Sequence, residues 1–344
     1  MSRLVDRNHA VSSLRGIAIA MVVLGHINRG VLETRAGMLA ALLNFLDFVL
    51  YTAHMPVFFY LAGYFTSRSL GNRTPTVFAK SRWAAIIYPY LLWSIITVAA
   101  HFVLSNVVHI NHMVPPAALS RIAWDPINVL WFLYALLCMQ LVAILLRKHP
   151  YLLLVVALGA SLAATLGASF LQGNVAGKIG THAPFFALGF TLAAAGIQPT
   201  PDAIRTKWFA TAAFAGWIAA CAIAYTYGIE NPTTFALLPI SILGIAALAS
   251  ISLIVTGPGT SVIGRHLAQM GDASLPIYLL HSFTLAVIPR ALRVLGVESP
   301  LLELAAGLAI GVYLSWGIYL LSRKIGVDGL LGFDAKKVPR LRKA

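Results

Sequence analysis

The feature that most constrains this chain is a series of apolar segments, each about 20 residues long and separated by short polar stretches. A bilayer core about 30 Å thick is crossed by roughly 20 apolar residues in helical form. Only 10% of the 344 residues are charged and 59% are hydrophobic, whereas a soluble domain carries about 25% charged residues. Charge is too scarce to cover a soluble surface. The sequence therefore predicts an all-α polytopic membrane protein.

About ten transmembrane helices with short connecting loops are predicted from apolar runs that end at charged residues or at proline and glycine clusters. The run at 150–170 is weakened by several Gly, Ala and Ser residues, which leaves nine or eleven spans open. Residues 36–44 either lie on the membrane surface or extend the second span. The predicted spans are 11–30, 48–66, 84–104, 127–146, 150–170, 180–197, 208–228, 234–256, 273–292 and 299–322.

The basic residues predict the orientation, because Lys and Arg collect in cytoplasmic loops. With ten spans and a cytoplasmic N-terminus, 12 basic residues fall in inner segments and 7 in the C-terminal tail, against 6 on the outer side, which accounts for all 25. Both termini are therefore predicted to be cytoplasmic. The net charge of +14 follows from this topology, so no nucleic-acid partner is expected. The two cysteines lie in apolar spans, and neither a disulfide framework nor a metal site is expected.

Two polar residues in the first span are the sharpest functional signal, because an ionisable residue is costly in lipid. Arg15 and His26 are eleven residues apart. At about 100° per residue they lie within roughly 20° of one helix face, about 16 Å apart along the axis. Arg15 is then near the cytoplasmic surface and His26 inside the membrane. The alternative is an arginine that reaches the interface and a histidine that only packs.

The second span begins with His54 near its outer end and is followed by a cytoplasmic basic cluster. Arg68, Lys80 and Arg82 belong to this cluster. Several cations together can hold phosphate groups. Composition alone explains the same residues equally well as an orientation signal.

Further polar and aromatic residues mark later spans. His182 begins a phrase, His-Ala-Pro-Phe-Phe, that repeats the pattern of the second span in the same orientation. Trp131 lies near the outer interface, where an aromatic belt also accounts for it. His281 is predicted near the middle of the membrane. No P-loop, HExxH, EF-hand or GxSxG pattern is present.

Five segments occur in the order and spacing of a known family. The chain resembles the membrane-bound acyltransferase family 3, and within it the fucose 4-O-acetylase-like branch. Ala62 stands where the family often has serine, so this position lacks a hydroxyl that could form a hydrogen bond. The resemblance implies one transmembrane acyltransferase domain over 1–333, followed by a basic, exposed cytoplasmic tail, 334–344. The segments are Leu14-Arg-Gly with His26, 54–64, 80–89, 131–134 and 274–281.

The resemblance implies an integral O-acyltransferase of the bacterial inner membrane. Such an enzyme moves an acyl group, usually acetyl, from cytoplasmic acyl-CoA to a hydroxyl of a carbohydrate or glycan acceptor, with membrane lipids around it. Arg15 and His26 carry over as the family's catalytic residues. CoA phosphates enter lipid only at great cost, so Arg15, Arg68, Lys80 and Arg82 are expected to hold them at the cytoplasmic surface. His54, Trp131 and His281 are expected to line the acceptor side.

Two mechanisms and two rival functions remain open from the sequence. His26 either deprotonates the acceptor hydroxyl as a general base or carries the acyl group itself. A transporter or flippase of lipid-linked sugars also uses many helices, intramembrane histidines and spans interrupted by Gly or Pro. A structural scaffold explains the helices but not the shared face of Arg15 and His26.

Overall fold

The computed structural model describes residues 2–33, 35–105, 114–167, 174–257, 261–294, 296 and 299–338, and these residues form helices and no strands. The predicted all-α class is therefore confirmed for the described part of the chain. The α-helices are α1 (Ser2–Leu32), α2 (Gly37–Tyr51), α3 (His54–Gly71), α4 (Pro75–Arg82), α5 (Tyr88–Ser105), α6 (Trp131–Leu145), α7 (Pro150–Thr165), α8 (Val175–Ala194), α9 (Lys207–Thr226), α10 (Leu238–Val255), α11 (Val262–Asp272), α12 (Ser274–Val294) and α13 (Pro300–Lys324).

Within the described residues, seven helical segments are long and apolar enough to cross a membrane. Helix α7 is apolar but has only 16 residues. Helices α8 and α12 occupy the predicted spans 180–197 and 273–292, and each carries an interior histidine, His182 and His281 respectively. The count of ten spans and the orientation of the termini remain predictions. The seven segments are Asn8–Leu32, Gly37–Gly71, Pro75–Val103, Asn128–Leu145, Lys207–Thr226, Phe235–Val255 and Pro300–Lys324.

The predicted span 48–66 is divided between two helices. Helix α2 ends at Tyr51 and α3 begins at His54, so residues 36–44 mostly belong to a separate helix that precedes the second span. Pro56 lies in the first turn of α3, where its missing N–H costs nothing. Between the helices, the Thr52 hydroxyl donates to the Val49 carbonyl and accepts the indole N–H of Trp217 at 3.0 Å. These contacts explain why the chain breaks here.

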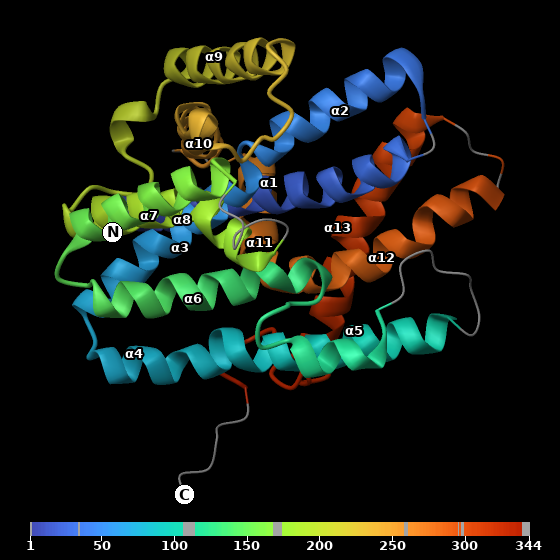
Figure 1. Cartoon of the computed structure of the whole chain (residues 1–344), viewed down its shortest axis with the longest axis horizontal. Coiled ribbons are helices and arrows are strands. Elements are labelled where there is room, and N and C mark those ends of the chain that lie inside the picture. The colour runs from blue at the N-terminus through green and yellow to red at the C-terminus, as the bar shows by residue number, and fades with distance from the viewer. Residues whose placement is uncertain are drawn as a thin grey trace, which may run out of the picture.

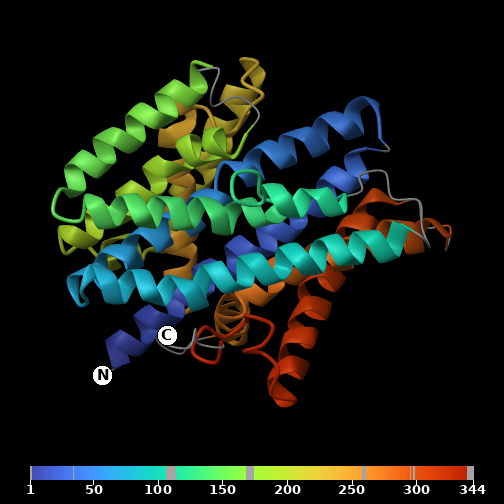
Figure 2. The same cartoon turned by 60° about the horizontal axis from the view of Figure 1, so that its bottom comes forward.

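Helix α1 runs through the middle of the molecule, and the other helices pack around it (Figure 1). It contacts α2, α3, α10, α11, α12 and α13. Helix α9 covers α10 on one side, and α4 and α5 form a nearly continuous rod along the opposite side (Figures 1 and 2). A π-helical turn, Trp83–Ile87, joins α4 to α5. Arg15 and His26 are thus presented by the central helix.

Helices α3 and α8, which share the sequence pattern noted above, pack closely against each other. Each helix has a glycine facing the backbone of the other: a Cβ at Gly63 would meet the carbonyl of Phe186, and a Cβ at Gly189 would meet the carbonyl of Tyr60. Small residues allow such close backbone approach in membrane helices. The repeated phrase therefore corresponds to a reciprocal helix pair.

Replacing Gly63 with alanine is expected to separate this pair. Adding a methyl group to a tightly packed site typically costs about 1–3 kcal/mol, so Gly63→Ala should unfold at a lower temperature in detergent. Gly71→Ala is the matched control, because no atom lies within 4 Å of a Cβ at that position. Equal melting temperatures for the two variants would contradict the close packing.

The chain after α13 folds back under α5. Phe333 stacks on Trp93 with ring centroids 5.7 Å apart, and the Trp93 indole donates to the Leu331 carbonyl. The Lys337 ammonium contacts the Asp328 carboxylate at 2.9 Å and holds its pKa below the usual range. The predicted tail begins at 334, yet packing continues to Val338, which is buried. The first part of the tail is therefore attached to the bundle, and residues 339–344 lie outside the described residues.

Candidate functional site

Several predicted site residues border a cavity of about 880 Å³, here called the outer cavity. It lies where α3, α6 and α8 begin and where α1 approaches its end. In the predicted orientation this is the outer end of the molecule, and the opposite end, with Arg15 and Arg68, is the inner end. His26, His54 and Trp131 all line this cavity. Three residues from three separate predicted spans thus meet at one site.

His281 has a different position from the one expected of an acceptor-side residue. It is fully buried and does not border the outer cavity. Its ring lies behind that of His26, with centroids 5.0 Å apart. Its Nδ1 atom is 2.6 Å from the carbonyl oxygen of Tyr278, and its Nε2 atom has no hydrogen-bond partner among the described residues. The geometry suits support of His26 better than direct contact with an acceptor.

His54 and His182 face the outer cavity in matching ways. The Nδ1 of His54 is 2.6 Å from the carbonyl oxygen of Leu50, and the Nδ1 of His182 is 2.8 Å from that of Lys178. A carbonyl only accepts, so each Nδ1 carries the proton and each Nε2 keeps its lone pair. Both rings can therefore accept a hydrogen bond from a hydroxyl group at Nε2.

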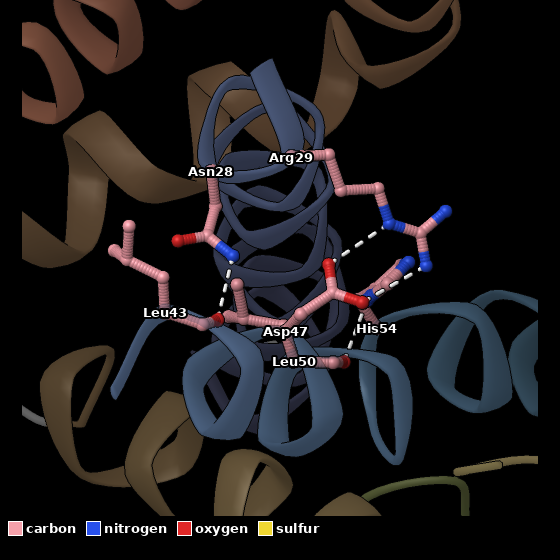
Figure 3. Close-up of polar contacts among 6 residues, drawn as sticks. All are labelled: Asn28, Arg29, Leu43, Asp47, Leu50 and His54. Atoms are coloured by element: carbon pink, nitrogen blue, oxygen red, sulfur yellow. Dashed lines mark hydrogen bonds and ion pairs between the residues drawn. The ribbon is translucent and has the colours of Figure 1, made fainter. Parts of the chain in front are cut away.

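Helix α2 is fixed across the outer end of α1 by two side chains (Figure 3). Asn28 donates to the Leu43 carbonyl at 2.9 Å. Arg29 makes a two-pronged contact with Asp47, at 2.9 and 3.0 Å, a geometry that orients both partners. The Arg29 guanidinium also lies 3.9 Å from the ring centroid of Tyr51. These contacts hold the cavity wall beside His26 and His54.

A second, narrow space lies next to the outer cavity and is called the apolar pocket. It has a volume of about 80 Å³ and is lined almost entirely by hydrophobic side chains from α1, α3, α6 and α12. Val22, Met55 and Tyr278 border both spaces. The Tyr278 hydroxyl is tied to the carbonyl of Val129. The apolar pocket is therefore the inward neighbour of the outer cavity.

Residues on one face of α1 border the two spaces one after the other. Ile19 lines the apolar pocket, Val22 lines both spaces and His26 lines the outer cavity. Arg15 precedes Ile19 by four residues, which is one turn on the same face. The four residues therefore form a row about 16 Å long, from a cation at the inner end to an imidazole at the outer cavity.

Arg15 lies where α1 crosses α11. Its guanidinium is 3.7 Å from the Asp272 carboxylate, and the Ser12 hydroxyl donates to the same carboxylate at 2.6 Å. The Arg15 side chain keeps 36% of its surface exposed. The helices meet through glycines, since a Cβ at Gly16 or Gly271 would overlap a carbonyl of the other helix. Arg15 is therefore positioned by its partners but still accessible.

The remaining predicted phosphate-binding residues are not joined to Arg15 by any contact within the described part of the chain. Arg68 borders a separate space of about 640 Å³ together with Arg147 and Lys148. Arg82 lies on the Phe78 ring, 4.3 Å from its centroid, and donates to Gln140. Lys80 is exposed on α4. The inner end thus has several cationic positions and not one compact cluster.

Several residues at these sites were not among those predicted. Lys178 and Arg29 contribute the cations at the outer cavity, and Tyr278 borders both spaces. His182 was visible in the repeated phrase, but its place beside Trp131, with ring centroids 5.4 Å apart, depends on tertiary packing. Asp272 pairs with Arg15 from a distant part of the sequence.

The fold and the site describe a multi-pass membrane protein with a half-buried histidine beside the point where a narrow apolar pocket meets a wider cavity of mixed lining. Residues 8–320 match a family model described as an acyltransferase domain. The chain therefore belongs to the acyltransferase family 3, as its motifs predicted, and is a membrane acyltransferase. No curated protein and no solved structure gives a significant match.

Proposed function

We propose that the protein transfers an acetyl group from cytoplasmic acetyl-CoA to a hydroxyl of a carbohydrate or glycan acceptor at the outer cavity. The observation that carries this proposal is the position of His26, beside the point where the apolar pocket meets the outer cavity. A donor that arrives along the Arg15 face and an acceptor in the outer cavity would meet at this residue. The fucose 4-O-acetylase-like branch and the bacterial inner membrane are part of the same proposal.

The size of the apolar pocket favours acetyl over longer acyl groups. A cavity of about 150 Å³ in a protein core binds benzene, which has six heavy atoms. The apolar pocket has a volume of about 80 Å³, which suits the three heavy atoms of an acetyl group. A longer acyl chain would require the walls formed by Val22 and Met55 to move.

The donor's phosphates would remain at the inner end, because burying them in lipid is costly. Arg15 is the cation on the face that leads to His26, and a planar guanidinium can hold a phosphate through two hydrogen bonds. Arg68, Lys80 and Arg82 offer further cationic positions at this end. Their separation in space fits an extended donor with phosphates at more than one point.

The chemistry needs a proton acceptor at the junction of the two spaces. The acceptor oxygen attacks the thioester carbonyl, the C–S bond breaks, and the hydroxyl proton passes through His26 to the departing CoA sulfur. In the alternative route, His26 nitrogen takes the acetyl group first and releases CoA, and the acceptor hydroxyl then takes the acetyl group. His281 would support the His26 ring in either route, since the two rings are in contact.

A transporter of lipid-linked sugars is the rival function, and CoA release separates the two. The purified protein, supplied with acetyl-CoA and a sugar acceptor, is expected to release free CoA in an acceptor-dependent manner. A transporter would leave the thioester intact. Absence of CoA release with every acceptor would therefore overturn the proposed function.

The donor side is tested by replacing Arg15. A hydrogen bond to a charged group contributes about 1.5–3 kcal/mol, so Arg15→Ala should raise the KM for acetyl-CoA by about 10- to 100-fold. Arg15→Lys should restore little, because an ammonium cannot make the two-pronged contact. Arg323→Ala, at the end of α13, is the control and should leave the KM unchanged. An unchanged KM in Arg15→Ala would show that Arg15 does not bind the donor and serves only as a signal for the orientation of the protein in the membrane.

A further inference from the structure

The outer cavity has an unusual charge balance for a site that takes a sugar. Its charged lining residues among those described are Arg29 and Lys178, and no Asp or Glu lines it. Both side chains are exposed, Arg29 near the end of α1 and Lys178 near the start of α8. A site for a neutral sugar needs hydroxyl and amide groups but no net positive charge.

The charge of Arg29 is already neutralised. Arg29 donates two hydrogen bonds to Asp47, at 2.9 and 3.0 Å (Figure 3). Its guanidinium also covers the ring of Tyr51. A bidentate arginine–carboxylate pair leaves little charge for a ligand. Arg29 is therefore a wall of the cavity and not its anion-binding group.

Lys178 is in the opposite situation. Its ammonium lies over Trp131, 5.2 Å from the ring centroid, and no carboxylate forms an ion pair with it among the described residues. The exposed carboxylate of Asp125 acts on it only from a greater distance. Lys178 also lies in the first turn of α8, where a cation is unfavourable because the helix N-terminus is itself positive. A negative ligand would offset this repulsion.

The uncharged lining of the same cavity suits sugar hydroxyls. Asn128, Thr181, Asn231 and Thr233 contribute amide and hydroxyl groups, which donate and accept hydrogen bonds. Asn128 has φ = +44°, the one positive value of a non-glycine residue in the described chain. Such a backbone conformation is costly and concentrates at functional sites. Asn128 lines the outer cavity three residues before Trp131.

We propose that the acceptor is an anionic sugar, whose carboxylate or phosphate group binds Lys178 while one of its hydroxyls reaches His26. This inference rests on the proposed function and adds the chemical class of the acceptor. Trp131 holds the Lys178 ammonium over the cavity, so the cation is positioned before the acceptor arrives. Carboxylate and phosphate groups share the required charge, and the experiment distinguishes them.

The test uses matched sugars that differ only at the sixth carbon. For glucose, galactose and mannose, the methyl glycoside is compared with its 6-carboxylate and its 6-phosphate. Each is added to the purified protein, and both the thermal stabilisation by the sugar and the acceptor-dependent CoA release are measured. We expect anionic members to stabilise the protein and to have KM values at least tenfold below those of the neutral members. The preferred anion identifies a uronate-like or a phosphorylated acceptor.

Variants of Lys178 assign the preference to this side chain. Lys178→Gln should raise the KM for the anionic sugar by about 10- to 100-fold, as expected for loss of a charged hydrogen bond, and leave the KM for acetyl-CoA unchanged. Lys178→Arg should retain the preference. Lys324→Gln, an exposed cation at the end of α13 that borders neither the outer cavity nor the apolar pocket, is the control and should behave as the unmodified protein.

The outcomes separate this inference from the proposed function. If neutral sugars bind and react as well as anionic ones, or if Lys178→Gln weakens both kinds equally, the inference is wrong while acetyl transfer stands. If no anionic sugar stabilises the protein, the inference is also wrong. If anionic sugars bind through Lys178 but CoA is never released, the anion site stands and the proposed acetyl transfer fails.

Discussion

Replacing His26 with glutamine is expected to abolish acyl transfer almost completely while leaving the protein folded. Glutamine keeps the ability to form hydrogen bonds at the junction of the apolar pocket and the outer cavity but cannot take up and release a proton. A general base typically contributes about 10²–10⁴-fold to the rate. The rate of CoA release with a sugar acceptor should therefore fall by this factor, and His26→Ala should be equally inactive. The melting temperature in detergent and the amount of protein in membranes report folding separately.

His149→Gln is the matched control for the His26 substitution. His149 is exposed in the turn before α7 and borders neither space, so its replacement should leave transfer unchanged. A loss below tenfold in His26→Gln would show that His26 only packs between helices. Rapid quenching of the unmodified protein with radiolabelled acetyl-CoA then distinguishes the two routes. A labelled adduct on His26 favours the covalent route, and its absence favours the general base.

The position of Arg15 and His26 on one face of α1 could be predicted from the sequence because helical geometry is regular. Eleven residues at about 100° each return to nearly the same face, so Arg15 and His26 could be assigned to one side of one helix without any knowledge of their neighbours. The structure adds Ile19 and Val22 to the same face and shows what that face borders. The all-helical fold class could be predicted equally well, because apolar segments of this length can form few other structures in a membrane.

The arrangement between helices was not accessible from one sequence. Lys178 is four residues before His182 and reads as an ordinary interfacial lysine until α8 is placed beside Trp131. His281 and His54 look alike in the sequence, yet one is buried behind His26 and the other faces the outer cavity. The break between α2 and α3 depends on Thr52 and Trp217, which are 165 residues apart. Each of these features depends on packing between distant segments, which local patterns do not encode.

Replacing Val22 with tryptophan is expected to have the second-largest effect, because it closes the route between donor and acceptor. Val22 borders both spaces and is 4% exposed. An indole at this position would fill the apolar pocket of about 80 Å³ and displace the acetyl group from His26. Since misplacing a reactant by about 1 Å can cost 10²-fold in rate, acceptor-dependent CoA release should fall by about a hundredfold or more.

A large residue in a packed core also destabilises, typically by about 1–3 kcal/mol, so a loss of activity alone would not prove a blocked route. Val156→Trp on α7, where the valine is 49% exposed, controls for the added indole and should remain active. The opposite substitution, Val22→Ala, gives an effect that destabilisation cannot mimic. It widens the apolar pocket, so the variant should use butyryl-CoA at a rate closer to that of acetyl-CoA than the unmodified protein does. If Val22→Trp retains full transfer, or if Val22→Ala leaves the preference for acetyl unchanged, the acyl group does not pass through the apolar pocket.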